Sequence, residues 1–337
     1  MKVYEIGNQE GLDSLRQVDR PDPIAGTGQA VVAVRASSLN HRDLMMMSGR
    51  YGQKKPETLI PLSDGAGEVI AISDGVSNVE PGDRVIAAHF TNWLDGPWNP
   101  IYFISDLGNT VDGTLAERIV LPAACLVKIP DSLSFEDACT LPVAANTAWH
   151  AIHVLGQIKA GDTVLMLGTG GVSVVALQLA KMNGARVAIT SSDDNKLKKM
   201  RELGADITVN YRTNPDWDKE IVEETGGRGA DIIVETGGMG TLGKSLSAAA
   251  ANGKIGFIGA LDQSGEQPNF MPMLIKNVTI KGITSGSRKM LADVVTAVTA
   301  NEMEAIIDKV FSFDEALDAY NYLDGALHIG KVVINHS

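Results

Sequence analysis

The chain has 337 residues, a formal net charge of −12 at pH 7, 44% hydrophobic residues and 21% charged residues. This composition is ordinary for a globular protein, and the length favours two domains over one. An acidic balance without a dense Lys/Arg cluster argues against nucleic acid or an anionic membrane as the main partner. Because the N-terminus lacks the apolar core of a signal peptide and no apolar run reaches membrane-spanning length, we expect a cytoplasmic protein.

The first 125 residues predict a β-rich domain. Runs rich in Val, Ile and Ala recur between turn residues, a pattern typical of short antiparallel strands. These runs are QAVVAVRASS (29–38), GAGEVIAIS (65–73), DRVIAAH (83–89) and LAERIVLP (115–122). A helix is expected over 134–152, starting at Ser134 and broken or kinked at Pro142. Cys125 and Cys139 lie among apolar residues, which favours buried core thiols over reactive ones.

From Gly161 onward, strand and helix patterns alternate. Six strand candidates follow one another at 163–167, 185–190, 206–211, 231–236, 254–260 and 277–284. Such alternation predicts a parallel, doubly wound α/β sheet. A last helix (314–323) and strand (331–335) are expected to return to the first domain. The predicted domains are therefore 1–125, 126–282 and a returning segment 283–337.

The most informative segment runs from 162 to 190 and contains the string GTGGVS. Gly168, Gly170 and Gly171 stand where the backbone must bend sharply and approach a pyrophosphate. The first amides of the following helix, including that of Val172, attract an anion. Ser173 takes the third glycine position of the G-x-G-x-x-G pattern and is small enough for close packing. The segment predicts a dinucleotide cofactor; the alternative is a tight turn in another kind of α/β protein.

Many further motifs occur in a specific order along the whole chain. They are SSLNHRD, PLSDGAGEV, EPGDRV, GTLAE, LPVAANTAW, ELGAD, GGRGADIIVE and IGKVVI. Through them the chain resembles the medium-chain dehydrogenase/reductase superfamily, in its alcohol dehydrogenase and quinone oxidoreductase group. The resemblance implies a GroES-like substrate domain, a Rossmann cofactor domain and an active cleft between them.

The resemblance also bears on zinc. Zinc-dependent members hold a catalytic zinc through Cys, His and Cys, and the matching positions here are Asn40, Ser63 and Val143, with Asp64 as the acidic neighbour. None of the three is a preferred zinc ligand. The region of the structural-zinc lobe, 89–110, contains no cysteine. We therefore expect no zinc. Five aromatic residues fill that region instead, either as a wall or lid over the cleft or as loop packing or a subunit interface.

The choice of nicotinamide depends on the end of the second strand of the α/β domain. NAD-selecting folds usually place Asp or Glu there, whereas this chain has Ser191 and Ser192. Small hydroxyls leave room for a 2′-phosphate, and Lys196 is near enough to neutralise it. Tyr211 and Arg212 occupy a place where related reductases often contact that phosphate. The aspartates at 193–194 would repel a phosphate unless they cap the next helix, which we favour. NADP(H) is preferred, with NAD(H) possible.

Further cofactor contacts follow from the resemblance alone. It implies that Thr147 lies near the nicotinamide and that the backbones around Gly237, Gly259 and Ser285 line its carboxamide. It also implies that Lys331 lies near the pyrophosphate or the nicotinamide ribose. For each residue, the alternative is a capping, turn or surface role.

Hydride transfer to a carbonyl or an activated alkene develops negative charge on oxygen, and without zinc that charge needs hydrogen-bond donors. The catalytic candidates are Asn40, His41, Arg42 and Tyr51, all from one segment. His41 could relay a proton or bond the cofactor or backbone. Asp43 is expected to orient a neighbour rather than to act as an acid.

The predicted function is zinc-independent, NADP(H)-dependent hydride transfer to a quinone, enone or carbonyl. Two alternatives stay open: an NAD(P)-dependent alcohol dehydrogenase acting on a bulky alcohol, and a non-catalytic NADPH-binding protein. The expected partners are a small-molecule substrate and further copies of the chain, as a homodimer or homotetramer, with 277–284 as a contact edge.

Overall fold

The computed structural model describes residues 1–259 and 267–336. The chain forms two compact units. Unit 1 contains residues 1–146 and the C-terminal segment from Gly286, and unit 2 contains Thr147–Ser285. The first boundary falls later than the predicted 125, because the segment that follows 125 pairs and packs with strands of unit 1.

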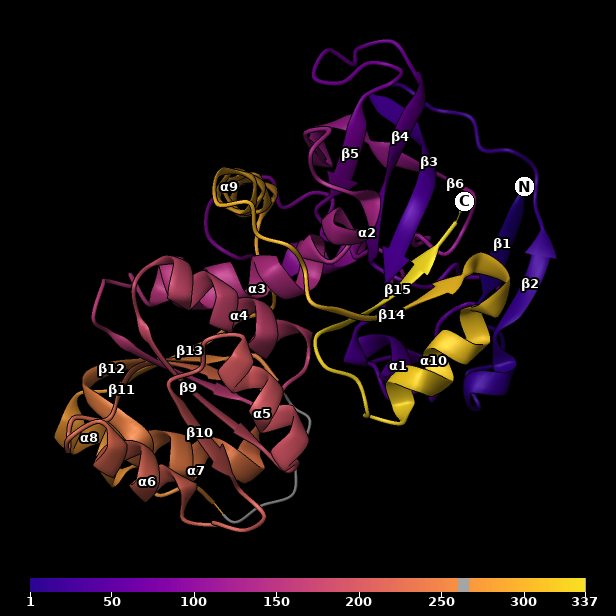
Figure 1. The fold of residues 1–337 in the computed structure, drawn as a ribbon. Helices are drawn as coiled ribbons and strands as arrows, with labels where there is room; N and C mark the ends of the chain where they lie inside the picture. Colours follow the sequence, from indigo (N-terminus) through magenta and orange to yellow (C-terminus); the bar gives the residue numbers. More distant parts are fainter. Residues whose placement is uncertain (260–266, 337) are drawn as a thin grey trace. The chain divides into compact units, whose positions relative to one another are not determined.

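Unit 1 is built on a sheet whose strands pair antiparallel, as the strand pattern predicts, except for the parallel pair β14–β15 (Figure 1). Its strand order is β14-β15-β3-β4-β5-β7, and β6 also pairs with β3. The strands are β3 (Gln29–Ser38), β4 (Asp64–Ile72), β5 (Arg84–Ala87), β6 (Arg118–Pro122), β7 (Leu126–Lys128), β14 (Ile307–Ser312) and β15 (Lys331–Asn335). A separate hairpin joins β1 (Lys2–Glu5) to β2 (Arg16–Asp19). The pairing of β15 with β3 returns the end of the chain to this unit.

The helices of unit 1 are short except for α9. They are α1 (His41–Met47), α2 (Phe135–Ala138), α9 (Arg288–Ala300) and α10 (Ala316–Asp324), with 3₁₀ turns at Leu12–Ser14, Pro100–Ser105, Ala123–Cys125 and Phe313–Glu315. Both cysteines are buried and free, as expected from their apolar neighbours. Burial raises the pKa of Cys125 to about 12, so its thiol stays protonated and unreactive.

The helix expected over 134–152 starts as predicted but is not regular. The Ser134 hydroxyl accepts a hydrogen bond from the Asp137 amide at 3.0 Å and caps α2. After α2 ends, wide π-helical turns follow at Leu141–Ala145 and His150–Leu155, on either side of α3 (Asn146–Trp149). Pro142 lies in the first of these turns, where its missing N–H is tolerated.

Unit 2 contains the predicted parallel sheet (Figure 1). Among the described residues, its strand order is β10-β9-β8-β11-β12-β13, all parallel. The strands are β8 (Thr163–Leu167), β9 (Arg186–Ser191), β10 (Ile207–Asn210), β11 (Ala230–Glu235), β12 (Ala249–Phe257) and β13 (Thr279–Gly282). The helices are α4 (Gly171–Met182), α5 (Asp194–Glu202), α6 (Trp217–Glu224), α7 (Met239–Ala248) and α8 (Met271–Lys276).

The strand order of unit 2 reverses between β8 and β11, the two middle strands. In open α/β sheets, ligands bind beyond the carboxyl ends of the strands at such a switch point. The Thr236 hydroxyl, which follows β11, donates to the carbonyl of Leu167 at the end of β8 at 2.8 Å and ties the two strand ends together. The fold therefore places the glycine turn after β8 where a dinucleotide would bind.

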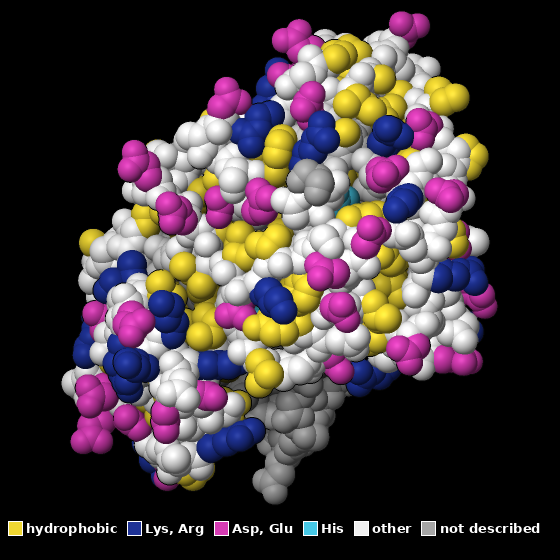
Figure 2. Space-filling view, turned by 45° about the vertical axis from the view of Figure 1, so that its right-hand side comes forward, with side chains coloured by type: hydrophobic (Ala, Val, Ile, Leu, Met, Phe, Trp, Pro, Cys, Tyr) yellow, Lys and Arg dark blue, Asp and Glu magenta, His cyan; other side chains and the backbone are white. Residues whose placement is uncertain are grey.

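The surface carries charges of both signs. On the face drawn in Figure 2, Lys and Arg side chains lie among Asp and Glu side chains rather than gathering on one broad basic area. Within the described ranges, no helix is long and apolar enough to cross a membrane.

Candidate active site

The glycine turn of unit 2 has the backbone that its sequence requires. Gly168 has a φ of +75°, which L side chains rarely adopt. A Cβ atom built on Gly168 or Gly170 would meet no atom within 4 Å, so open space lies over both. Helix α4 starts at Gly171 without a side-chain cap, which leaves its first amides available to an anion.

Ser173 explains how the motif works without a third glycine. Its side chain is buried, and its hydroxyl donates to the carbonyl of Leu167 at 2.7 Å. The hydroxyl thus ties α4 to the end of β8, where a glycine would allow close packing alone. This departure from the pattern leaves the turn intact.

The carboxylates after β9 are committed elsewhere. The Asp193 carboxylate caps α5 by accepting hydrogen bonds from the amides of Asn195 and Lys196 at 2.7 and 3.1 Å, as the sequence predicts. Asp194 accepts from the Asn210 side chain at 2.9 Å. Ser191 is buried at the end of β9. A serine hydroxyl therefore stands at the position where NAD-selecting folds carry an acid.

Three more of the candidates for the 2′-phosphate lie around the end of β9: Tyr211, Ser192 and Lys196. The Tyr211 amide donates to the Ser191 carbonyl at 3.0 Å, and the Tyr211 side chain is exposed. Ser192 directly follows β9 and is half-buried. Lys196 is half-buried in the first turn of α5. Parallel pairing of β10 with β9 brings Tyr211 to this edge of the sheet, whereas Ser192 and Lys196 follow β9 directly in the chain.

The structure brings together Thr147 and Ser285, two candidates far apart in the sequence. Both are buried, and their hydroxyls are 3.4 Å apart. His150 adds a contact that sequence reasoning missed: its Nδ1 lies 2.6 Å from the Ser285 carbonyl oxygen. The π-helical turn that begins at His150 directs this ring toward the end of the segment after β13.

The loop after β11 depends on Glu235, a second residue that sequence reasoning missed. This carboxylate is fully buried and accepts hydrogen bonds from the amides of Gly237 and Gly238 at 2.8 and 3.1 Å. It also accepts from the Thr241 and Ser245 hydroxyls. A buried acid with these donors fixes the loop at the switch point.

Gly259 follows β12 and lies against the end of β11. A Cβ atom there would come within 1.7 Å of the Thr236 carbonyl oxygen, so the position requires glycine. Gly237 is crowded to a lesser degree, because a Cβ atom would lie 2.4 Å from the Thr241 side-chain hydroxyl rather than against backbone. Both glycines have a packing role whether or not they touch a cofactor.

In unit 1, the Asp64 carboxylate is the centre of a buried polar cluster at the start of β4. Its Oδ2 accepts from the Ser38 hydroxyl at 2.8 Å and from Asn40 Nδ2 at 2.9 Å. Its Oδ1 accepts from the Val143 amide at 3.0 Å. The fourth donor is the Lys331 ammonium, 3.1 Å from Oδ2. The carboxylate is fully buried and satisfied on both oxygens.

Lys331, which the resemblance implies to lie near a pyrophosphate or the nicotinamide ribose, has a side chain that is buried in unit 1. Its Nζ contacts Leu39, Asn40 and Asp64, and the cofactor contact stays a prediction. Antiparallel pairing of β15 with β3 brings the lysine to this position. Motif order could not reveal the contact, because the partners are far apart in the sequence.

Helix α1 positions the catalytic candidates. The Asp43 carboxylate accepts a hydrogen bond from the backbone N–H of Asn40 at 2.7 Å and so closes the first turn of the helix. This contact is compatible with the orienting role expected for Asp43. Burial raises the pKa of Asp43 to about 6, against the opposing effect of Arg42. His41 is exposed. Its pKa is lowered, chiefly because its ring is partly desolvated and secondly because Arg50 carries a positive charge nearby.

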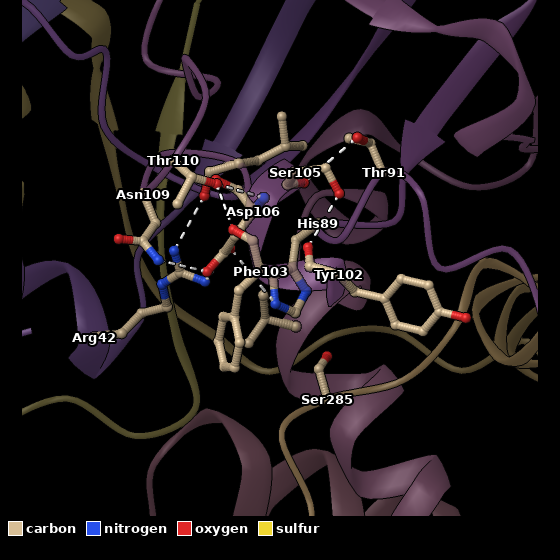
Figure 3. Close-up of polar contacts among 12 residues, drawn as sticks. Arg42, His89, Thr91, Tyr102, Phe103, Ser105, Asp106, Asn109, Thr110 and Ser285 are labelled. Atoms are coloured by element: carbon tan, nitrogen blue, oxygen red, sulfur yellow. Dashed lines mark hydrogen bonds and ion pairs between the residues drawn. The ribbon is translucent and has the colours of Figure 1, made fainter. Parts of the chain in front are cut away.

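Arg42 leads to a second buried cluster, drawn in Figure 3. Its guanidinium pairs with Asp106 at 2.8 Å and lies 5.2 Å from the centre of the Tyr51 ring. Asn109 donates to the same carboxylate at 2.8 Å, and His89 Nε2 lies 3.9 Å from it. Burial lowers the pKa of His89 to about 4, so the imidazole is neutral. Sequence reasoning missed both Asp106 and His89.

The aromatic residues of 89–110 pack on one another. Phe90 and Trp93 are buried, and the Trp98 ring lies 4.8 and 5.0 Å from theirs. Tyr102 stacks on Trp93 at 5.8 Å, and Phe103 lies edge-on to Phe90 at 5.5 Å. The rings thus supply the internal packing of this lobe, as one of the two interpretations expected.

Comparison with known proteins decides the family. The model of an alcohol dehydrogenase GroES-like domain matches 26–131, and that of a zinc-binding dehydrogenase matches 171–300. A zinc-type alcohol dehydrogenase-like protein of Schizosaccharomyces pombe is 40% identical over 331 residues, which cover 96% of each chain. The chain belongs to the medium-chain dehydrogenase/reductase superfamily.

Solved structures of the superfamily agree with this assignment. A putative alcohol dehydrogenase from Sinorhizobium meliloti has a TM-score of 0.92 and 38% identity, covering 99% of both chains. An NAD-dependent alcohol dehydrogenase has a TM-score of 0.91 and 32% identity over the full length of both. This medium-chain dehydrogenase/reductase is accordingly an alcohol dehydrogenase-like oxidoreductase with a GroES-like domain and a Rossmann domain.

The family name raises the question of zinc, and the donor set does not fit it. Zinc in proteins prefers thiolate, imidazole and carboxylate ligands. Here the Asp64 carboxylate is surrounded by the Asn40 amide, the Val143 backbone and the Lys331 ammonium. Ser63 is buried with its hydroxyl unpaired, but it is a weak ligand. Among the described residues, no three His, Cys, Asp or Glu side chains group closely enough to hold a metal.

Proposed function

We propose that this enzyme transfers hydride from NADPH to a quinone, an enone or a carbonyl compound without zinc. The proposal rests on the Asp64 cluster. Asp64 holds the position of the acidic residue beside the catalytic zinc in zinc-dependent relatives, and here its carboxylate is paired with the Lys331 ammonium. With no suitable metal ligands, the developing negative charge on the substrate oxygen must be met by hydrogen-bond donors.

The nicotinamide cofactor supplies the hydride. Gly168, Gly170 and the first amides of α4 at Gly171 and Val172 would hold its pyrophosphate, since this turn leaves open space and unpaired helix amides. Thr147 and the backbones at Gly237, Gly259 and Ser285 remain the candidates for the nicotinamide end.

The preference for NADP(H) rests on the end of β9. Ser191 and Ser192 offer hydroxyls, with Tyr211 beside them, while the Asp193 and Asp194 carboxylates are engaged by α5 and by β10. A 2′-phosphate would therefore meet donors rather than a free carboxylate. The similarity to an NAD-dependent alcohol dehydrogenase makes NADH the necessary comparison.

Asn40 is the best-placed donor for the substrate oxygen. Its amide is half-buried at the start of α1 and is held by the Asp64 cluster. His41 is the next residue and is exposed, so it could carry a proton between solvent and the site. Tyr51 is a weaker candidate, because burial raises the pKa of its phenol and its ring stacks under Arg42.

The test is NADPH oxidation with a panel of 1,4-naphthoquinone, 2-cyclohexenone and benzaldehyde, repeated with NADH. We expect turnover of at least one acceptor and a preference for NADPH. Tight NADPH binding without turnover on any acceptor would instead favour a non-catalytic cofactor-binding protein. Equal or better use of NADH would contradict the part assigned to Ser191.

Alcohol oxidation is the second candidate, and the similarity to proteins named alcohol dehydrogenases favours it. The same residues would then act in the opposite direction: the alcohol proton would pass to solvent through His41, Asn40 would stabilise the alkoxide, and the hydride would go to NADP⁺ or NAD⁺. Incubation with benzyl alcohol and NADP⁺ or NAD⁺ separates the two. Oxidation that clearly exceeds reduction of all three acceptors would favour the alcohol dehydrogenase.

We also propose that the enzyme forms a homodimer or homotetramer through the β13 edge of unit 2. Among the residues that the structure describes, strand β13 is the last of the sheet, and a free strand edge can pair with another copy. On α8, the side chains of Leu274 and Ile275 are 71% and 72% exposed, which is unusual for apolar residues unless a partner covers them. Light scattering should give a multiple of 35.7 kDa that falls in the Ile275→Lys variant, which changes an exposed side chain.

A further inference from the structure

The Lys331 ammonium uses all of its donors inside the protein. Its Nζ donates to the Leu39 carbonyl at 2.7 Å, to Asn40 Oδ1 at 2.7 Å and to Asp64 Oδ2 at 3.1 Å. An ammonium has three N–H groups, so none is left for a ligand. The residue is 6% exposed. Lys331 can therefore influence a substrate only through the groups that it holds.

One of those groups is the side-chain amide of Asn40. Its oxygen accepts from Lys331, and its Nδ2 donates to Asp64 at 2.9 Å. Turning the amide over would place its NH₂ against the ammonium and its oxygen against the carboxylate. Both contacts would then be repulsive, so the network permits a single orientation.

That orientation leaves one donor free. The Asn40 amide has two N–H groups, and the described residues provide an acceptor for only one of them, Asp64. Asn40 is half-buried rather than fully enclosed, so part of this residue can be reached from outside the cluster. A fixed donor of this kind is what a developing oxyanion needs, since it requires no reorganisation during the reaction.

We propose that Lys331 is a positioning residue: with Asp64 it locks the Asn40 amide so that its second N–H points to the substrate oxygen. The proposal rests on the proposed hydride transfer and gives it a donor of defined orientation. It assigns to the lysine a role different from direct contact with cofactor phosphate.

A double-mutant cycle tests the coupling between Lys331 and Asn40. Asn40→Ala should lower kcat by about 10²-fold, the loss typical of one oxyanion donor. Lys331→Met should lower kcat about tenfold or more, with little change in the Kd for NADPH, and the double variant should match Asn40→Ala alone. Losses that multiply would overturn the proposal, as would a Lys331→Met variant that binds NADPH weakly but keeps its kcat.

Two further variants control for folding. Lys331→Met leaves the buried Asp64 carboxylate without its cation. The double variant Lys331→Met/Asp64→Asn removes both charges and should therefore fold. Lys276 is a matched control in unit 2, since its ammonium also donates to two carbonyls, those of Ser247 and Ala249, at 2.6 and 2.8 Å. Lys276→Met should leave kcat unchanged.

A measurement on the Asn40 amide itself needs no substrate. In deuterated protein, the side-chain ¹H–¹⁵N pair of Asn40 is assigned by its absence in Asn40→Ala. Lys331→Met should speed solvent exchange of this amide at least tenfold, and Lys276→Met should not. Unchanged exchange would overturn the positioning role. If the wild type reduces no acceptor but the exchange result holds, the proposed function fails while the lock on Asn40 stands.

Discussion

Replacing His89 with phenylalanine should remove a pH-dependent part of the folding free energy. His89 is 2% exposed, and burial lowers its pKa from 6.5 to about 4. Between these values the unfolded chain binds a proton that the folded chain does not. Stability from this group is therefore complete above pH 6.5 and falls as the pH drops toward 4. From pH 7.5 to pH 5.0 the linkage gives a loss of about 2 kcal/mol.

Urea unfolding at both pH values measures the loss, with tryptophan fluorescence as the signal. Trp93 and Trp98 belong to the same unit as His89, and phenylalanine can keep the contact with the Phe90 ring. The wild type should lose about 2 kcal/mol more than His89→Phe between the two pH values. His41→Gln, at an exposed position, is the control and should keep most of the slope. An equal loss of unfolding free energy in the wild type and in His89→Phe would contradict the lowered pKa of His89.

Three further changes give separate tests. Arg42→Met leaves the buried Asp106 carboxylate without its cation and should lower the urea-unfolding free energy by about 3–5 kcal/mol, whereas Arg228→Met breaks an exposed pair and should cost under about 1 kcal/mol. Gly168→Ala forces an L side chain to a φ of +75° and should cost about 1–2 kcal/mol, visible as a lower Tm, and weaken NADPH binding in a fluorescence titration. Ser191→Asp should shift the NADPH/NADH ratio of kcat/KM at least about tenfold toward NADH, because a carboxylate repels the 2′-phosphate and accepts from a ribose hydroxyl. Equal losses for the two arginine changes would contradict the role of Arg42. An unaltered Tm would contradict that of Gly168, and an unchanged ratio of kcat/KM for the two cofactors would contradict that of Ser191.

Local patterns predict the fold and the local conformation of the glycine turn and of the residues after β9. The strand–helix alternation after Gly161 predicts the parallel sheet, because each element there buries its own apolar face. The glycine turn, the Asp193 cap and the small residues after β9 are also local, and the structure has them as expected. The split of 134–152 into α-helical and π-helical turns was not predictable, since Pro142 marks a disturbance but not its form.

The buried polar clusters were beyond local patterns. Asp64 gathers donors from β3, α1, the segment after α2 and β15, and no spacing in the sequence connects Lys331 with Asn40. Asp106 likewise meets Arg42 from a distant segment. Such contacts depend on strand register and on which side chains share the interior, and both are set by the tertiary fold.

Zinc content and turnover measured on the same sample show directly whether hydride transfer by this enzyme is independent of zinc. The enzyme is treated with a chelator, dialysed, analysed for zinc by mass spectrometry and assayed at once for NADPH oxidation with its best acceptor. We expect the enzyme to keep its full turnover when it contains far less than one zinc per chain. Turnover that disappears with the zinc and returns when zinc is added back would contradict it.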